Sequence, residues 1–298
     1  MEYRTLKTMR PYVSKGDQAL NVVNFLFPEW QGFGSNNQVY HGALAMHQAF
    51  EHFGNFVAVD LPQDEHLRTR QGILGHDAIL RNIIRAQEIL QRYQPDRIFM
   101  IGGTCASEMA PVAYLNRRYQ GNMTVIWFDA HGDLNTPDSS PTGRFHGMVL
   151  RTLLGEGDAS LTKQVLPPLR TDQVILAGVR DLDLPEADFI REKQMPCLSV
   201  NDLDDPGDLL GHLDDRDSSR LYIHLDLDIL DPGAFRGAQV ECPGGVLLDG
   251  LITILKALDE HFDIVGLSLV EYASRSSREA ARIATALNQA GLGLFGTL

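Results

Sequence analysis

Several features are scarce or missing in this 298-residue sequence, and each absence narrows the class of protein. The three cysteines, Cys105, Cys197 and Cys242, are too few and too scattered for a disulfide framework, which favours a reducing, cytoplasmic compartment. No apolar run approaches the ~20 residues that cross a bilayer, so we expect no membrane partner. Residues 1–4 lack the basic and apolar regions that open a secretory signal.

Basic residues are also fewer than acidic ones. The sequence has 26 Lys and Arg against 39 Asp and Glu, which gives a formal net charge of −13. This acidity argues against a nucleic-acid partner, whose phosphates would be repelled, and it is compatible with a small cationic substrate. The hydrophobic content of 44% and the charged content of 22% are ordinary for a soluble globular protein. The length suits one large α/β domain or two smaller ones.

What the sequence does contain is a regular alternation of short apolar runs with helical patterns. The expected strands are residues 22–27, 56–59, 97–101, 124–128, 174–177, 197–200, 221–227 and 264–270. Between them, apolar residues recur at helical spacing, as in Ile79, Ile83 and Ala86, and residues 43–50 also read as helix. We therefore predict an α/β fold with a mainly parallel central sheet that helices cover on both faces. In such sheets, ligands bind at the carboxyl ends of the strands.

Two short segments at expected strand ends carry a cluster of acidic and imidazole groups. These potential metal ligands are Asp129, His131 and Asp133 in the first segment, and His224, Asp226, Asp228 and Asp231 in the second. Residues i, i+2 and i+4 of a strand share a face. We therefore expect the three residues of the first segment to point one way, and His224, Asp226 and Asp228 to share a face of their own strand. Carboxylates at the ends of buried strands are costly unless a cation pairs with them.

The chemistry of these donors favours two metal ions. Carboxylate-rich ligation with imidazole suits Mn²⁺ or a similar cation, and the donors outnumber what one four-coordinate ion needs. Two ions roughly 3.5–4 Å apart lower the pKa of a bridging water to give hydroxide near neutral pH. A single Asp-X-Asp at a strand end is commonly a turn or a helix cap, but two such segments with an interleaved histidine favour a metal centre.

The sequence between about Ile101 and Glu271 resembles the ureohydrolase family, which contains arginases, agmatinases and formiminoglutamases. The resemblance is carried by Asp129-Ala130-His131-Gly132-Asp133 and by Asp226-Leu227-Asp228 followed by Asp231-Pro232. It implies a single ureohydrolase domain over residues 1–298 with a three-layer α/β/α architecture. It also implies two Mn²⁺ per chain and a homo-oligomer, either a trimer or a hexamer.

Taken position by position, the resemblance also implies roles for the clustered residues. The implied metal ligands in the two segments are Asp129, His131, Asp133, Asp226 and Asp228. Asp129 and Asp226 would bridge the two ions, and Asp133 would also pass a proton from the hydroxide to the leaving amine. His224 shares the predicted face, but the family usually has Ser there, so we expect it beside the ligands rather than among them.

Two further residues resemble catalytic groups of the family. His146 matches a proton-shuttle histidine at the end of the polar loop 133–147, and its alternative is a structural histidine. Glu271 follows an apolar run and matches the glutamate that anchors the guanidinium group. A salt bridge to Arg275 is the alternative for Glu271.

A third set of residues resembles the part of arginases that holds the amino-acid end of the substrate. The implied substrate-binding residues are Asn135, Thr142, Arg144, Asp183 and Glu186. Arg144 stands where arginases have Asn, and its guanidinium could grip a carboxylate bidentately. For Asp183 and Glu186, a solvated loop or a helix cap is the alternative.

The resemblance breaks at Gly102-Gly103-Thr104-Cys105-Ala106, where family members usually carry Gly-Gly-Asp-His-Ser. Cys105 then replaces a histidine and becomes the sixth implied metal ligand. Thiolate favours Zn²⁺ or Fe²⁺ over Mn²⁺, so we expect one site to be weak for Mn²⁺ or occupied by another divalent metal. An inert core residue is the alternative for Cys105.

The sequence therefore predicts metal-dependent hydrolysis of a linear guanidino C–N bond by a metal-bridging hydroxide. Arginine or a close analogue would give urea and an ornithine-like amine. Because of Cys105, the sequence also resembles the branch of the family that hydrolyses Nω-hydroxy-L-arginine to hydroxyurea and ornithine. Agmatinase-like activity, formiminoglutamase-like activity and a catalytically silent binding homologue are the remaining alternatives.

Overall fold

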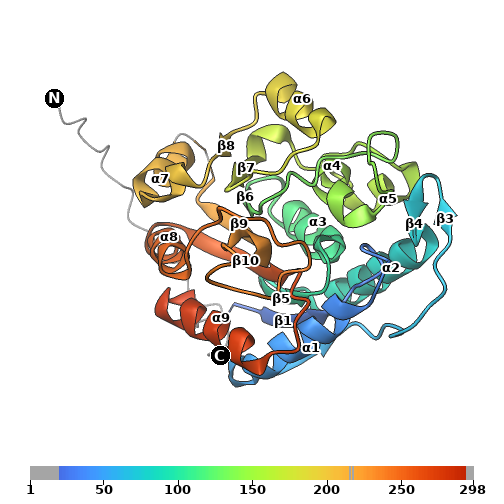
Figure 1. The fold of residues 1–298 in the computed structure, drawn as a ribbon, viewed down its shortest axis with the longest axis horizontal. Helices are drawn as coiled ribbons and strands as arrows, with labels where there is room; N and C mark the ends of the chain where they lie inside the picture. The colour runs from blue at the N-terminus through green and yellow to red at the C-terminus, as the bar shows by residue number, and fades with distance from the viewer. Residues whose placement is uncertain (1–19, 215, 217, 293–298) are drawn as a thin grey trace.

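A computed structural model describes residues 20–214, 216 and 218–292 (Figure 1). The prediction that no secretory signal opens the chain concerns residues 1–4, which lie outside the described residues. Within the described part of the chain, no helix has the length and apolar character that crossing a membrane requires.

An eight-stranded sheet forms the middle layer, in the order β2-β1-β5-β10-β9-β6-β7-β8. Every pair of neighbouring strands in it is parallel, which confirms the predicted sheet. The strands are β1 (Val22–Phe27), β2 (Phe56–Ala58), β5 (Arg97–Gly102), β6 (Thr124–Phe128), β7 (Val174–Ala177), β8 (Cys197–Leu198), β9 (Arg220–Asp226) and β10 (Asp263–Val270). A separate antiparallel pair, β3 (Thr69–Arg70) and β4 (Ile73–Leu74), was not predicted, because two-residue strands leave no periodicity to detect.

Helices cover both faces of the sheet. They are α1 (Gln38–Ala49), α2 (His76–Tyr93), α3 (Met109–Arg118), α4 (Val149–Leu153), α5 (Ala159–Thr162), α6 (Leu184–Lys193), α7 (Pro206–Asp214), α8 (Leu248–His261) and α9 (Ser277–Gln289). Helices α1, α7, α8 and α9 lie on one side of the sheet, and α2 to α6 lie on the other (Figure 1). The arrangement is the predicted three-layer α/β/α sandwich.

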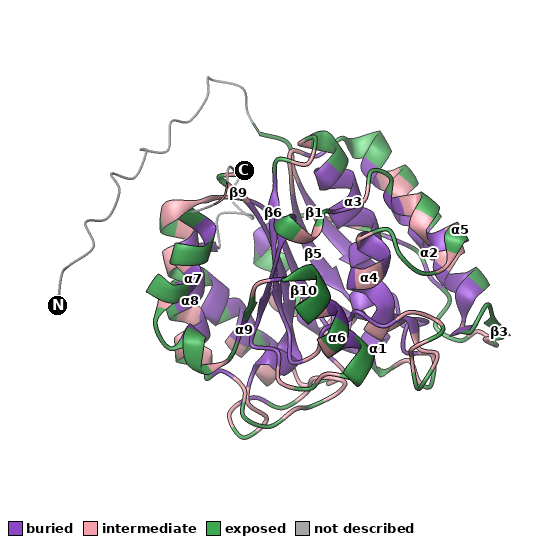
Figure 2. Ribbon diagram, turned by 90° about the horizontal axis from the view of Figure 1, so that it is seen from above, coloured by how far each residue is buried: buried purple, intermediate pink, exposed green. Residues whose placement is uncertain are grey.

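The alternation of side chains along the strands explains why both faces are buried. In β6, Val125 and Trp127 belong to one apolar cluster, whereas Ile126 and Phe128 belong to the other. Each strand therefore reads as a continuous apolar run, which is typical of parallel sheets under helices on both faces. Figure 2 shows these strands as the buried layer between the helices.

The strand predicted over residues 197–200 is too long. Only Cys197–Leu198 pairs with β7, because both the backbone N–H and the hydroxyl of Ser199 donate to the Asp202 carboxylate, each at 2.7 Å. This local turn removes the amide of Ser199 from the sheet and starts a 3₁₀ helix at Asn201–Leu203.

Candidate metal centre

Four neighbouring strands bring the predicted site together at one edge of the sheet. Strands β5, β10, β9 and β6 are adjacent and parallel, so their carboxyl ends meet. Cys105 follows β5, Glu271 follows β10, Asp226 ends β9, and Asp129 follows β6. All of these side chains are buried.

The expected sharing of one strand face is wrong for most of the cluster. Strand β6 ends at Phe128, so Asp129 to Asp133 lie in a loop, and Asp133 has a left-handed backbone with φ of 51°. Asp228 lies in the 3₁₀ helix η7 (Leu227–Ile229). Only His224 and Asp226 remain within a strand. The groups converge because the chain turns sharply after each strand, not because the strands continue.

Hydrogen bonds within these turns hold the carboxylates in place. The backbone N–H of His131 donates to Asp129 Oδ1 at 2.6 Å, and that of Asp228 donates to Asp226 Oδ1 at 2.8 Å. A third bond joins the two segments, because the N–H of Ala130 donates to Asp228 Oδ1 at 2.9 Å. Each carboxylate is therefore oriented by the backbone before any cation is bound.

The potential ligands form three overlapping groups, within each of which the donor atoms lie within 4.8 Å of one another. The groups are Cys105, Asp129, Asp133 and His224; Cys105, Asp226 and Glu271; and Asp129, His131 and Asp228. Asp129 belongs to two of them, with Oδ1 3.4 Å from His131 Nδ1 and Oδ2 3.6 Å from His224 Nε2. A carboxylate with its two oxygens turned to different groups suits the bridging position between two cations.

The electrostatics of the cluster also fit cations. Burial, followed by repulsion from Asp228 and Asp129, raises the pKa of Asp226 well above its ordinary value. Burial and Asp129 raise the pKa of Asp133 in the same way, and Asp133 Oδ2 is buried without a hydrogen-bond partner. For Asp129, burial is outweighed by His131 and His224, which lower its pKa. Crowded, partly unpaired carboxylates of this kind are stabilised when divalent cations bind between them.

Glu271 lies beside the cluster in a constrained conformation. Its backbone has φ of 61°, and its N–H donates to the Gly103 carbonyl at 2.7 Å. Its Oε1 accepts the N–H of Cys105 at 2.9 Å and lies 3.5 Å from His146 Nδ1, whereas Oε2 is buried without a partner. Among the described residues, no ion pair joins Glu271 to Arg275, the alternative partner that the sequence left open.

Glu29 is a buried acid that the sequence prediction missed. It is fully buried, it accepts the N–H of Gly32 at 2.9 Å and the hydroxyl of Thr104, and it feels the charge of Glu271. Burial is the largest influence and raises the pKa of Glu29 to about 7. A carboxylate two residues after the apolar run 22–27 was the available signal, but no motif singled it out.

The predicted substrate-binding residues fall into two places. Asn135 donates to Asp183 Oδ2 at 2.8 Å. Glu186 accepts the N–H groups of Leu134 at 2.8 Å and Asp183 at 3.0 Å, so its carboxylate caps α6 and ties it to the loop after the metal segment. This contact matches the helix-cap alternative, and it makes Glu186 a positioning group for Asn135 and Asp183.

Thr142 and Arg144 lie apart from that set. Thr142 is exposed, and the Arg144 guanidinium donates to Ser35 at 2.7 Å and lies 4.3 Å from the centre of the Phe33 ring. Within residues 20–214, 216 and 218–292, no hydrogen bond or ion pair links Thr142 or Arg144 to Asn135, Asp183 or Glu186. Phe33 also contacts His146 edge-on, with ring centroids 5.3 Å apart.

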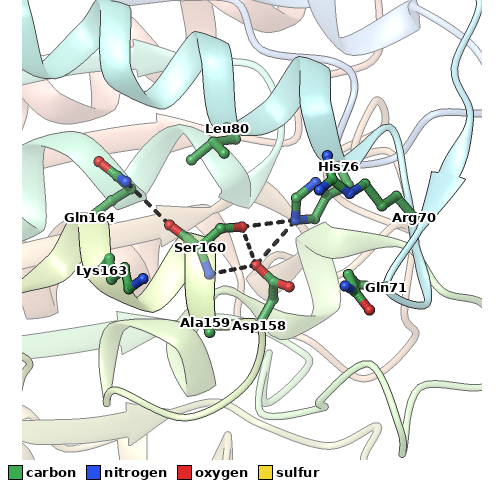
Figure 3. Close-up of a pocket in the computed structure, with 9 residues that line it drawn as sticks. All are labelled: Arg70, Gln71, His76, Leu80, Asp158, Ala159, Ser160, Lys163 and Gln164. Carbon is green, nitrogen blue, oxygen red and sulfur yellow. Dashed lines mark hydrogen bonds and ion pairs between the residues drawn. The ribbon is translucent and has the colours of Figure 1, made fainter.

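A second cluster of polar groups lines a cavity of about 310 Å³ that includes none of the clustered ligands (Figure 3). His76 Nε2 lies 3.0 Å from the Ser160 hydroxyl and 3.1 Å from Asp158 Oδ1. The group looks like a nucleophile–histidine pair, but the Ser160 hydroxyl donates its hydrogen bond to Asp158, which is the N-cap of α5. Asp77, the other partner of His76, is two-thirds exposed. The cluster joins the start of α2 to α5.

The fold and the site define a class of protein: a parallel α/β sheet with buried carboxylate and imidazole groups at the strand ends that could hold metal ions. Comparison with known proteins then identifies the family. The model of the family described as "Arginase family" matches residues 35–292. This chain belongs to the arginase family, whose members are hydrolases that act on C–N bonds in amidines and guanidino groups.

Individual relatives agree with this assignment. An arginase of Staphylococcus aureus strain COL is 30% identical over 210 residues, which cover 68% of this chain and 69% of that protein. An arginase of strain MRSA252 is 32% identical over 178 residues, or 58% of this chain and 59% of that protein. The solved structure of arginase from Bacillus caldovelox superposes with a TM-score of 0.81 at 25% identity, covering 92% of this chain and 99% of that one.

Proposed function

We propose that this protein is an arginase-type amidinohydrolase that cleaves the guanidino C–N bond of arginine or a close analogue, giving urea and an ornithine-like amine. The observation that carries the proposal is the free oxygen of Glu271. Its Oε2 is buried and unpartnered, and Glu271 shares a ligand group with Cys105 and Asp226. A guanidinium bound there would pair with the carboxylate and place its central carbon beside the metal ligands.

The residues of the chain divide the remaining work. When bound, two divalent cations supply a water whose pKa is lowered enough to ionise near neutral pH. Asp133 is buried next to Asp129, and because its pKa is raised it suits the holding of a proton during transfer. His146 lies 3.5 Å from Glu271, and its side chain is 19% exposed, so it can carry a proton between the site and solvent as the amine leaves.

Two sets of polar side chains suit the amino-acid end of the substrate. The pair of Asn135 and Asp183, held at 2.8 Å and positioned by Glu186, offers an acceptor for an α-ammonium group. Arg144 offers a donor for a carboxylate, and it lies against Phe33 near His146. These contacts favour a substrate that keeps both its α-amino and α-carboxylate groups over agmatine, which lacks the carboxylate.

Nω-hydroxy-L-arginine is a second candidate substrate because of one specific residue. Cys105 Sγ donates to Asp226 Oδ2 at 3.3 Å and belongs to two of the ligand groups. A sulfur donor changes the cation preference and the charge of the centre relative to an imidazole at that position. Its product pair would be hydroxyurea and ornithine.

A substrate panel tests the proposal. Protein loaded with Mn²⁺, Zn²⁺ or Fe²⁺ would be incubated with arginine, Nω-hydroxy-L-arginine, agmatine and formiminoglutamate, and the released urea, hydroxyurea or formamide measured. We expect turnover of arginine or hydroxyarginine and at least a 100-fold loss in kcat/KM for Glu271→Gln. The variant Glu88→Gln, on the exposed face of α2, is the matched control and should keep full activity. If no guanidino or formimino compound is hydrolysed with any of the metals, the proposal is wrong.

A further inference from the structure

His224 occupies the middle of the sheet with a ring nitrogen that has no partner. It lies in β9, opposite Trp127 of β6 and Ser268 of β10, and it is fully buried. Its Nε2 makes no hydrogen bond, and the nearest acceptor, Asp129 Oδ2, is 3.6 Å away. A buried imidazole nitrogen without a partner costs free energy unless something that is bound there uses its lone pair.

The other ring nitrogen has a strong partner that sets the tautomer. His224 Nδ1 lies 2.9 Å from Glu108 Oε1, and Glu108 is fully buried at the end of the 3₁₀ helix η2 (Cys105–Glu108). Glu108 also accepts hydrogen bonds from the hydroxyl groups of Tyr222, at 2.6 Å, and Ser268. Because the carboxylate only accepts, Nδ1 carries the hydrogen, and in the neutral imidazole Nε2 then keeps its lone pair.

Neighbouring rings hold that lone pair in one direction. Trp127 stacks on His224 with ring centroids 3.5 Å apart and planes at 15°. The indole N–H of Trp127 donates to Asp129 Oδ2 at 3.1 Å, so the same tryptophan orients both the imidazole and the carboxylate next to it. His224 Nε2 then converges with Cys105, Asp129 and Asp133 within 4.8 Å.

We propose that His224 Nε2 is a ligand of the divalent cation that Asp129 and Asp133 hold, and that Glu108 positions the imidazole through Nδ1. The proposal rests on the two-metal centre of the proposed function, and it revises the expectation that His224 lies beside the ligands. The arrangement of carboxylate, imidazole and cation is the usual one for a metal-bound histidine. It also supplies the cation near Cys105 with the nitrogen donor that a sulfur at that position does not provide.

A structural role as a buried counter-charge is the competing explanation. Burial lowers the pKa of His224, but the carboxylates of Asp129 and Glu108 raise it to about 9. An imidazolium would donate from both nitrogens, yet the 3.6 Å separation of Nε2 from Asp129 Oδ2 exceeds hydrogen-bond distance. The geometry therefore favours a lone pair at Nε2.

Metal binding by purified full-length protein tests the proposal directly. Metal-free wild type, His224→Ala and Glu108→Gln would be titrated with Mn²⁺ and with Zn²⁺ by calorimetry, with bound metal counted after dialysis. We expect wild type to bind two ions, His224→Ala to bind one of them at least 100-fold more weakly, and Glu108→Gln to weaken the same ion about 10-fold. His76→Ala removes another buried histidine held by carboxylates and should bind both ions as wild type does.

X-ray absorption at saturating Zn²⁺ keeps the test valid if His224→Ala is partly unfolded. The mean number of imidazole ligands per zinc should fall by half in His224→Ala, because His131 would be the remaining imidazole donor among the described ligand groups. The double variant Cys105→His with His224→Ser removes the imidazole at position 224 and places one at position 105, within the same ligand group. It should regain most of the affinity that His224→Ser alone loses.

The outcomes separate this proposal from the proposed function. Unchanged affinity for both ions and an unchanged imidazole count in His224→Ala overturn the ligand role while leaving amidinohydrolase activity intact. Loss of one ion in His224→Ala without turnover of any guanidino compound by wild type supports the ligand role and overturns the function. Wild type that binds no metal overturns both.

Discussion

At the scale of single residues, several acids in and near the candidate metal centre are buried, and burial disfavours their ionised form. Asp228 is buried beside Asp129, and its pKa rises to about 6. Glu29 reaches about 7 without belonging to any ligand group. The ligand motif was readable in the sequence because its spacing is specific. Glu29 was not, because burial and the nearby Glu271 raise its pKa, and both come from the fold.

The raised pKa of Glu29 predicts a pH dependence of stability. Because the folded value of about 7 exceeds the ordinary 4.5, the native state holds a proton that the unfolded state has lost, and stability falls as pH rises from about 4.5 through 7. The resulting loss in the free energy of unfolding is at most on the order of 3 kcal/mol. In metal-free protein, Glu29→Gln should remove this part of the fall.

The measurement is urea unfolding between pH 4.5 and 8 in the presence of chelator, with Glu88→Gln as the exposed control on α2. Comparison with wild type isolates Glu29 from other acids such as Asp228, which act in the same direction. A pH profile for Glu29→Gln that parallels wild type would show that Glu29 keeps an ordinary pKa.

At the scale of elements, the helix α1 approaches the chain closely just after the carboxyl end of β10. A Cβ on Gly42 would lie 1.6 Å from the carbonyl oxygen of Tyr272, the residue after Glu271. The sequence predicted a helix around residues 43–50, and the helix runs over Gln38–Ala49. Its contact with residue 272 had no local signal, since the two are far apart along the chain.

This contact predicts that Gly42→Ala is destabilising, against the usual helix preference. Alanine normally stabilises an exposed helix interior by about 1 kcal/mol relative to glycine. Here the methyl group collides with backbone, and we expect a loss of about 1–3 kcal/mol or more. Gly211→Ala in α7, where nothing lies within 4 Å, is the matched control and should be neutral or stabilising. Thermal unfolding of the two variants measures this difference in stability. An equal gain in thermal midpoint for both would disprove the close contact.

At the scale of the whole molecule, the acidic composition and the crowded centre link stability to cations. The chain carries a formal net charge of −13, and Asp226, Asp228 and Asp133 all have raised pKa values where they are buried together. Binding to the native state alone stabilises it by RT ln(1 + [L]/Kd), or about 2.7 kcal/mol for one ion at 100 times its Kd. We therefore expect bound cations to relieve a repulsion that the carboxylates of the metal-free protein retain.

We predict that Mn²⁺ or Zn²⁺ raises the thermal midpoint by several degrees and that chelation reverses the gain. Asp226→Asn should raise the midpoint of the metal-free protein, because it removes one buried charge from the cluster, and it should lose most of the metal-induced rise. Scanning calorimetry with and without chelator measures both effects. A lower midpoint for metal-free Asp226→Asn would mean that the repulsion among the carboxylates is not a significant cost.

The sequence alone was sufficient to predict the parallel sheet, its two helical layers and six of the side chains that the fold gathers into potential ligand groups. The sheet and helices follow from local periodicity, five of the side chains from two short motifs, and Cys105 from the segment Gly102–Ala106. The turns that aim Asp133 and Asp228 were not readable, because the chain leaves the strands where the alternation had seemed to continue. The pairing of His224 with Glu108 spans 116 residues, so only the packing of η2 against β9 could show which ring nitrogen of His224 is left without a hydrogen-bond partner.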